Sequence, residues 1–372
     1  MESVQIRLYA DEKPIAGIAH PGPHQIYRHP FVRLEKKALG PLKEEEIRVE
    51  MLYAGLCGTD IHLIEKSRDT GYIKSSAPLS IPTDQGRRIG HEGVGRVIET
   101  GRMVRHVRAG SYVTFESIIV CHYCDVCRKG HFNQCRNASL LGLQTDGLFG
   151  TIVDVPAMLA HDITDLVKTE ADLKSLACVE PAGVAYVACQ NTRIKGGDNV
   201  IIFGAGPIGI FAAILSKTIF GASEVHIVEP VAFRRDFASR WADYVYDLSE
   251  FRENPPSNID VAIEASGGMD NIDAVFRKIN PNGRIALLAR SGEPFQISAV
   301  DHMITNAISL IGSRGHLCGA FSDIMTLYRQ NRIPLGEVVT LVIEGIEALC
   351  SLLDHPGRTI QDNCKVLVCF KK

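Results

Sequence analysis

The sequence predicts an α/β protein of two domains, a β-rich domain over 1–184 and a domain with a doubly wound parallel sheet over 185–319. The chain has 372 residues, more than a single hydrophobic core usually holds. Its first half is rich in glycine, proline and short β-branched runs, which is typical of strands joined by turns. From about 185, apolar strands alternate with helical segments through short connections, which favours a parallel sheet.

The composition excludes several classes of partner. Apolar residues make up 45% of the chain and charged residues 22%, and the net charge is −3, so no strong field attracts nucleic acid or an anionic membrane. The N-terminal MESVQIRLYADEK lacks the basic start and apolar core of a signal peptide. The longest apolar run, 200–216, is short and glycine-rich for a membrane span. We expect a cytoplasmic protein with no nucleic-acid or membrane partner.

In the β-rich part, IRVEMLYAG, GVGRVIET and SYVTF are predicted strands, and four cysteines follow them. Cys121, Cys124, Cys127 and Cys135 form a C-x2-C-x2-C-x7-C pattern. In a reducing compartment this spacing indicates a metal before a disulfide, and four thiolates would hold zinc in a closed tetrahedral site that stabilises a loop. Unrelated thiols are the alternative. A DNA-binding finger is disfavoured, because the paired histidines are absent and the charge is mixed.

The second half opens with an apolar strand, NVIIF, that runs into the glycine turn GAGPIG and a predicted helix from Pro207 and Ile208. Gly204 permits a tight turn, Gly206 lets the backbone approach a pyrophosphate, and Gly209 allows close contact between helix and strand. The helix N-terminus offers free N–H groups to phosphates. A glycine-rich turn that binds nothing is the alternative.

An acidic residue supports the nucleotide interpretation. Glu229 closes the next strand, twenty residues past Gly209, where a ribose diol would lie. A carboxylate there accepts hydrogen bonds from ribose hydroxyls and repels a 2′-phosphate, which favours NAD over NADP. Arg234 and Arg235 lie nearby; turned inward they could hold a phosphate and admit NADP, and turned outward they would cover a helix surface.

Three further short segments are informative because of the order in which they occur along the chain. GLCGTDIH contains Cys57, Thr59, Asp60 and His62; GHEGVGRV contains His91 and Glu92; CVEPAGVA contains Glu180. With the four-cysteine segment and GAGPIG, their order resembles the zinc-dependent medium-chain dehydrogenase/reductase family, in its sorbitol, threonine and glucose dehydrogenase branch. The resemblance runs from about 45 to the C-terminus.

The resemblance implies a GroES-like catalytic domain over 1–184, completed by 320–372, and a Rossmann dinucleotide-binding domain over 185–319. It implies that Cys57, His91 and Glu180 bind a catalytic zinc, in addition to the structural zinc of the four cysteines. Glu92 matches a nearby carboxylate that binds the metal in some members. Thr59 and His62 match a proton relay. Relatives are commonly dimers or tetramers, so a homo-oligomer is expected.

The chemistry of these residue types agrees with that implication. Three protein ligands leave zinc a fourth position for water or a substrate oxygen, and the metal then lowers the pKa of a bound alcohol. A hydride can pass to the nicotinamide while Thr59, the ribose hydroxyls and His62 carry the proton to solvent. A plain surface histidine is the alternative for His62.

The function expected is that of a zinc-dependent, NAD(P)-linked alcohol, polyol or sugar dehydrogenase acting reversibly on a small secondary alcohol. The alternatives are a glucose-type sugar 1-dehydrogenase using NADP, an L-threonine 3-dehydrogenase and, in another class, a non-catalytic nucleotide-binding scaffold. The polar stretch between His62 and Gly90 fits none of these branches closely. Within it, Arg87 and Arg88 are expected either to meet an anionic group of the substrate or to lie in a solvated loop.

Overall fold

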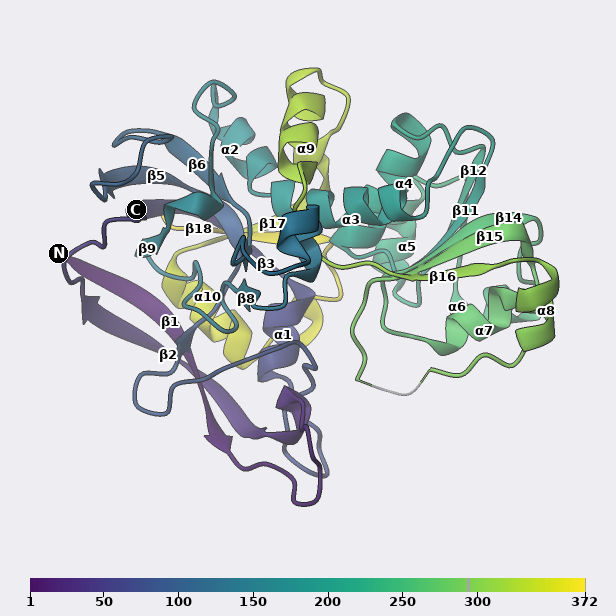
Figure 1. Cartoon of the computed structure of the whole chain (residues 1–372), viewed down its shortest axis with the longest axis horizontal. Helices are drawn as coiled ribbons and strands as arrows, with labels where there is room; N and C mark the ends of the chain where they lie inside the picture. Colours follow the sequence, from purple (N-terminus) through teal and green to yellow (C-terminus); the bar gives the residue numbers. More distant parts are fainter. Residues whose placement is uncertain (293–294, 372) are drawn as a thin grey trace. The chain divides into compact units, whose positions relative to one another are not determined.

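The computed structural model describes residues 1–292 and 295–371, and the chain divides into two compact units (Figure 1). The first unit comprises Met1–Glu180, Val339–Gly357 and Lys365–Lys372, and the second comprises Pro181–Val338 and Arg358–Cys364. Among the described helices, none combines the length and apolar character that crossing a membrane requires.

The main sheet of the first unit has the order β10-β6-β5-β3-β18-β17, with β9 also paired to β3. These strands are β3 Glu46–Leu56, β5 Glu92–Thr100, β6 Tyr112–Phe115, β9 Ile152–Pro156, β10 Ala160–Asp162, β17 Val339–Glu344 and β18 Lys365–Cys369. A two-stranded ribbon accompanies them, β7 Ile118–Ile119 with β8 Ser139–Leu140. The helices of this unit are α1 Gly58–Ile64, α2 Glu170–Leu176 and α10 Ile346–Asp354.

The end of the chain returns to the middle of this sheet. Strand β18 runs antiparallel to β3, with Val368 opposite Ala54, and parallel to β17. Every residue of β18 is buried, including Lys365. Such a buried strand, apolar apart from its lysine, is typical of the middle of a sheet. Its position brings Lys365 beside Glu92, more than 270 residues earlier in the sequence.

A second, three-stranded sheet has the order β2-β1-β4, from β1 Glu2–Glu12, β2 Tyr27–Ala38 and β4 Arg87–Arg88. The expectation of a solvated or substrate-facing loop at Arg87 and Arg88 is wrong, because both are buried in β4 opposite Leu8 and Arg7. Arg7 and Arg87 form ion pairs with Asp146, at 2.9 and 3.1 Å. Buried guanidinium groups need such a counter-charge, so these arginines join the N-terminal hairpin to the loop that carries Asp146.

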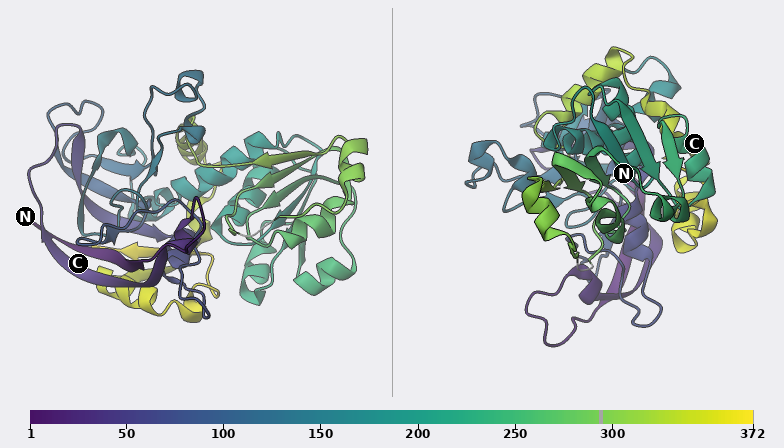
Figure 2. Two further views of the ribbon diagram at one scale, coloured as in Figure 1. Left: turned by 60° about the horizontal axis from the view of Figure 1, so that its bottom comes forward. Right: turned by 90° about the vertical axis from the view of Figure 1, so that its right-hand side faces the viewer.

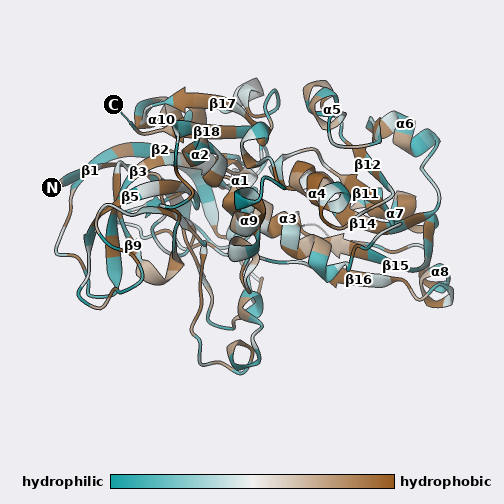
Figure 3. Ribbon diagram, turned by 90° about the horizontal axis from the view of Figure 1, so that it is seen from above, coloured by the Kyte–Doolittle hydropathy of each residue, from teal (hydrophilic) through white to brown (hydrophobic). Residues whose placement is uncertain are grey.

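The second unit contains a six-stranded parallel sheet of order β13-β12-β11-β14-β15-β16 among the described residues. Its strands are β11 Asn199–Phe203, β12 Glu224–Val228, β13 Tyr244–Tyr246, β14 Ile259–Glu264, β15 Ile279–Leu287 and β16 Ser309–Gly312. Helices lie on both faces of the sheet (Figure 2). Figure 3 shows hydrophobic residues concentrated in β11 and α4, as expected for a sheet buried on both faces.

The helices of this unit are α4 Pro207–Thr218, α5 Ala232–Ala238, α6 Leu248–Glu253, α7 Asp270–Phe276, α8 Val300–Thr305 and α9 Ala320–Arg329. Helix α3, Val179–Asn191, contains the boundary between the units. The remaining short 3-10 turns are η1 Pro23–Gln25, η2 Cys127–Lys129, η3 Phe132–Gln134, η4 Ala157–Leu159, η5 Leu335–Val338 and η6 Gly357–Thr359.

The boundaries differ from those expected at 184 and 320. The first unit ends at Glu180 and resumes at Val339, so α9 lies with the second unit. The reason is that α9 packs on α3: Phe321 lies beside Gly183, and Asp323 makes a hydrogen bond with Tyr186. The sequence of α9 is amphipathic, which predicts a partner for its apolar face without saying which one.

Candidate active site and structural metal site

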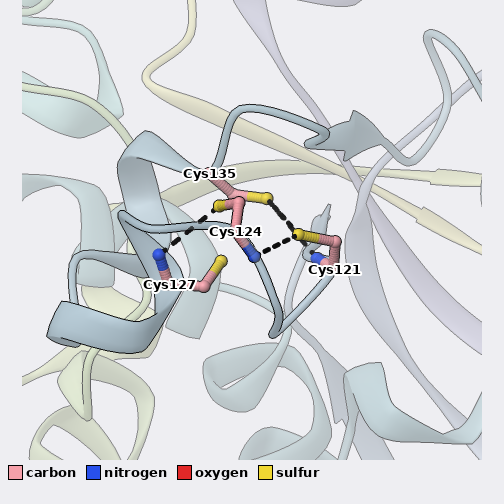
Figure 4. A group of neighbouring side chains, drawn as sticks. All are labelled: Cys121, Cys124, Cys127 and Cys135. Carbon is pink, nitrogen blue, oxygen red and sulfur yellow. Dashed lines mark hydrogen bonds between the residues drawn. The ribbon is translucent and has the colours of Figure 1, made fainter.

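The four-cysteine segment folds into a lobe in which all four sulfurs turn toward one another (Figure 4). The sulfurs of Cys121, Cys124, Cys127 and Cys135 lie within 4.8 Å of one another. Backbone amides point at them: the Cys124 N–H donates to Cys121 Sγ over 3.4 Å, and the Cys127 N–H donates to Cys124 Sγ over 3.5 Å. Turns η2 and η3 provide the bends that make this possible.

The acid–base state of the lobe fits a bound cation. Desolvation acts to raise the pKa of Cys121, but amide hydrogen bonds from Cys124 and Tyr123 outweigh it and lower that pKa to about 6. Desolvation and the neighbouring sulfurs raise the pKa of Cys127 to about 12. Four clustered sulfurs cannot all ionise without a compensating charge, and a closed set of four thiolates is the ligand set of structural zinc.

A second group forms in the interior of the first unit. One ligand atom each of Cys57, His91 and Glu92 lies within 4.8 Å of the others. Cys57 directly follows strand β3 and stands at the N-cap of α1, while Glu92 is the first residue of β5, which pairs with β3. Two segments 34 residues apart therefore meet because adjacent antiparallel strands align Gly55 with Glu92.

Asp60 orients this group, although the sequence assigned it no role. Its Oδ2 accepts the Cys57 N–H over 3.0 Å, and its Oδ1 lies 3.7 Å from His91 Nδ1. The other ring nitrogen, His91 Nε2, lies 4.0 Å from Glu92 Oε1. Asp60 Oδ1 and His91 Nδ1 are too far apart for a hydrogen bond, so Asp60 acts on the imidazole through its charge, while Nε2 is the ring nitrogen nearer to Glu92. The signal available in the sequence was the spacing of Asp60 three residues after an N-cap.

Lys365 is the second residue that the sequence missed. Its ammonium group is buried and donates to Glu92 Oε2 and, over 3.0 Å, to the Leu56 carbonyl. Space for this pair depends on Gly55, where a Cβ atom would lie 2.5 Å from Glu92 Oε2. Burial acts to lower the pKa of Lys365, but the charge of Glu92 outweighs it and raises that pKa. The ammonium therefore stays protonated and offsets the charge of Glu92.

Glu180 lies close to this group but is not part of the close trio. It stands in the first turn of α3, is buried, and its Oε1 accepts a hydrogen bond from Ser117 Oγ at 3.2 Å. Its charge is near enough to raise the pKa of Glu92, after the larger effect of burial. Glu180 therefore lies near Glu92, whereas Glu92 is the carboxylate that lies close to both Cys57 and His91.

The two relay candidates lie on α1. Thr59 is half-buried, and His62 is exposed in the last turn of the helix. Crowding around the His62 ring still desolvates it and lowers its pKa, so the ring is neutral at pH 7 and free to accept a proton.

The buried centre fits a divalent metal. Cys57, Asp60, Glu92 and Glu180 place several acidic groups in the interior, and Lys365 and His91 are the basic groups that face them. Burial, followed by the charge of Glu92, raises the pKa of the Cys57 thiol, so a thiolate there needs a cation beside it. A sulfur, an imidazole and a carboxylate are a donor set typical of catalytic zinc.

The glycine turn in the second unit has the geometry expected of a phosphate-binding loop. Gly204 adopts φ +98°, and a Cβ atom on Gly209 would lie 1.9 Å from the Gly204 carbonyl oxygen, so both positions require glycine. A Cβ atom on Gly206 would meet no protein atom within 4 Å, which leaves room for a ligand against the backbone. Helix α4 begins immediately afterwards with Pro207 as its first residue and Ile208 as its second.

Glu229 directly follows β12, and its side chain turns back to this loop. Its Oε2 accepts the Ala205 N–H over 2.8 Å, and its Oε1 accepts the Val231 N–H over 2.9 Å. Arg234 donates to the carbonyl oxygens of Ile360 and Asn363, and Arg235 donates to those of Glu229 and Pro230. Glu229 therefore lies against the glycine turn, whereas Arg234 is hydrogen-bonded to residues in 360–363. The sequence around Arg234 could not predict these partners, because residues 360–363 are distant along the chain.

This combination of fold and sites defines a zinc-binding oxidoreductase of the alcohol dehydrogenase type. Residues 43–165 match the model of the alcohol dehydrogenase GroES-like domain, and residues 207–329 match that of the zinc-binding dehydrogenases. The chain belongs to the zinc-dependent medium-chain dehydrogenase/reductase family.

The relatives have names from several branches of this family. The chain is 30% identical to scyllo-inosose 3-dehydrogenase of Thermotoga maritima, over 82% of each protein. It is 29% identical to L-threonine 3-dehydrogenase of Pyrococcus horikoshii, over 81% of this chain and 85% of that protein. The fold is also similar to an Escherichia coli CFT073 alcohol dehydrogenase solved with NADH, with a TM-score of 0.80 and 22% identity over 99% of both chains.

Proposed function

We propose that the protein oxidises a secondary alcohol of a polyol, sugar or hydroxy amino acid to the ketone, reversibly, with NAD as hydride acceptor. The observation that carries this proposal is the meeting of Cys57, His91 and Glu92 in the interior, with the Asp60 carboxylate beside the imidazole. A closed structural site would not need so many acidic groups around one position. The names of the relatives support this range of substrates.

Each residue of the centre has a distinct task in this proposal. A bound zinc would act as a Lewis acid on the alcohol oxygen, while a bound nicotinamide would accept the hydride. Cys57 and His91 hold the metal, and Asp60 holds His91. Thr59 takes the alcohol proton and His62, which is exposed and neutral, passes it to solvent.

Glu229 supports the choice of NAD over NADP. Its carboxylate accepts an amide of the glycine turn, and beside a bound dinucleotide it would accept hydrogen bonds from the adenosine ribose hydroxyls and repel a 2′-phosphate. A cavity of about 610 Å³ beside Pro230, lined by Arg235, Arg252 and Ser249 among others, keeps NADP and the glucose-type activity as the second candidate. Initial rates with each cofactor separate the two, and a strong preference for NADP would contradict the role given to Glu229.

The experiment that tests the proposed function is a screen of polyols, sugars and L-threonine with zinc-loaded protein, followed by NADH absorbance. Metal analysis belongs with it, because an enzyme with both sites is expected to hold two zinc ions per chain. One zinc per chain, confined to the four-cysteine lobe, together with no turnover of any substrate, would instead support a non-catalytic nucleotide-binding scaffold.

We further propose a homo-oligomer in a reducing compartment such as the cytoplasm. Strand β16 lies at the edge of the six-stranded sheet and offers unpaired backbone groups to a second copy. The eleven cysteines are free thiols, which supports a reducing environment. Light scattering after gel filtration tests the oligomer, and cell fractionation tests the compartment.

A further inference from the structure

Strand β2 forms one edge of the three-stranded sheet in the first unit (Figure 1). Its outer side is partly covered at the start of the strand, where the His29 N–H donates to the Gly71 carbonyl over 3.0 Å. Over 31–38 no other strand pairs with that side among the described residues, and this stretch has no proline and no register shift. A regular strand edge of this kind offers backbone hydrogen bonds to another strand.

The hydrogen bonds between β1 and β2 show which residues of β2 face this free edge. The Leu39 N–H donates to the Met1 carbonyl over 3.0 Å, in register with the ladder, and hydrogen-bonded pairs alternate along an antiparallel ladder. Odd-numbered residues from 31 to 37 therefore bond to β1. The Ile6 N–H agrees with this phase, because it donates to the Phe149 carbonyl and not to β2. The residues whose backbone groups point outward are Val32, Leu34 and Lys36.

The side chains along this edge combine apolar surface with an uncompensated charge. Phe31 and Leu34 are 39% and 36% exposed. The Arg33 guanidinium lies over the Phe31 ring, 4.8 Å from its centroid, and stands opposite Arg7 of β1. Arg33 has no ion pair among the described residues, whereas Arg7 is paired with Asp146. A carboxylate supplied from beyond the edge would offset the charge of Arg33.

We propose that β2 pairs with β2 of a second copy of this chain, antiparallel and about a two-fold axis at Leu34. Leu34 then stands opposite Leu34 of the second copy and exchanges two backbone hydrogen bonds with it. On both sides of the axis Arg33 stands opposite Glu35, in the type of pair whose side chains approach most closely.

Charge selects this register over its neighbours. Only even-numbered residues can pair across the edge, so the register changes in steps of two residues. One step in one direction places Arg33 opposite Arg33, and one step in the other places Glu35 opposite Glu35. Like charges directly opposite each other destabilise a strand pair.

The contact would join two three-stranded sheets into one of six strands. It lies in the first unit and is separate from the contact proposed at β16 in the second unit. Two different two-fold contacts on one chain are what a tetramer built from dimers requires. This inference goes beyond the proposed function and depends on no metal, cofactor or substrate.

Cysteine cross-linking tests the register in the full-length protein. Leu34→Cys places two thiols at the axis, where the Cα atoms of a hydrogen-bonded pair lie about 5.5 Å apart, within the range of a disulfide. With oxidised glutathione as the oxidant we expect a covalent dimer, and peptide mapping should show that the link joins the two introduced thiols.

Lys36→Cys is the matched control, at an exposed position of the same edge. In the proposed register its two copies lie four residues apart along the strands, about 14 Å, and should stay unlinked. The proposal is overturned if Leu34→Cys gives no covalent dimer, or if Lys36→Cys links as readily. The first of these results would mean that the lysines of β2 keep other strands away from its edge.

A charge exchange tests the pairing of Arg33 with Glu35. Arg33→Glu places two carboxylates opposite each other on both sides of the axis, and the dissociation constant of this contact should rise about 10-fold or more. Arg33→Glu/Glu35→Arg restores opposite charges and should restore association. Sedimentation over a range of concentrations measures both, with circular dichroism to compare the folds.

Arg105→Glu, at an exposed arginine away from β2, is the control and should associate as the wild type does. The proposal is overturned if Arg33→Glu associates as the wild type does, or if the double variant associates no better than Arg33→Glu. Failure of the proposed function would look different, because it would appear in turnover and zinc content and leave the β2 contact unchanged.

Discussion

The four-cysteine lobe and the buried centre both gather cysteine ligands, but they are assembled in opposite ways. The lobe takes its four sulfurs from 15 consecutive residues and surrounds them with its own amide groups. The buried centre takes its groups from the N-cap of α1, the start of β5, the start of α3 and β18, and surrounds them with acidic and basic side chains. This difference supports the proposed division of roles, in which the lobe would stabilise structure and the centre would control the charge around the substrate position.

The largest expected effect comes from Cys57→Ser. Loss of the thiolate removes the metal that stabilises charge in the transition state, so turnover should fall about a thousand-fold or more. The measurements are kcat with the best substrate and zinc content, which should fall from two ions to one. Cys318→Ser, at an exposed cysteine, is the control and should behave as the wild type. Full activity in Cys57→Ser would contradict the proposal that the buried centre, unlike the lobe, takes part in catalysis.

Lys365→Met should have the next largest effect, on stability. The substitution leaves Glu92 buried without its counter-charge, and the free energy of unfolding should fall by about 3–5 kcal/mol. Urea unfolding followed by circular dichroism measures this change. The double variant Lys365→Met/Glu92→Gln removes both charges and should regain much of the loss. A stable single variant would show that the buried centre does not depend on the charge balance between Lys365 and Glu92.

Cys124→Ser should lower the stability of the protein less than Lys365→Met does, and it should change turnover little. The lobe should lose its zinc while the buried centre keeps its own, and the free energy of unfolding should fall by more than about 2 kcal/mol. The fraction of folded protein is measured first, and kcat per folded chain is then expected to stay within a few-fold of the wild type. If instead the turnover of folded Cys124→Ser disappeared, the two sites would not be separable.

The smallest expected effect is a difference in thiol reactivity between the two sites after the metal has been removed. In chelator-treated protein, iodoacetamide should label Cys121 at half its maximal rate near pH 6, because its pKa is lowered to about 6. Labelling of Cys121 should fall below that pH as the thiolate is protonated. Cys57 has a raised pKa and should stay unlabelled at pH 7. Peptide mapping by mass spectrometry reads both rates, and equal labelling at pH 7 would contradict the contrast.

Features that depend on neighbours along the chain can be predicted from the sequence alone. The spacing of the four cysteines, the glycine turn at Gly204–Gly209 and the alternation of strands and helices after 185 each lie within a short window, and local geometry suffices to form them. The order of short motifs also indicated Cys57, His91 and Glu180, whose roles the proposed experiments test.

Contacts between segments that are distant in the sequence become visible in the folded chain. It paired Arg87 with Asp146, turned Arg234 toward residues 360–363, and brought Lys365 to Glu92 across more than 270 positions. These partners are selected by the need to satisfy buried charges, and that need arises only after the sheets have packed. No spacing rule in the sequence encodes them, since the distance between such partners along the chain is arbitrary.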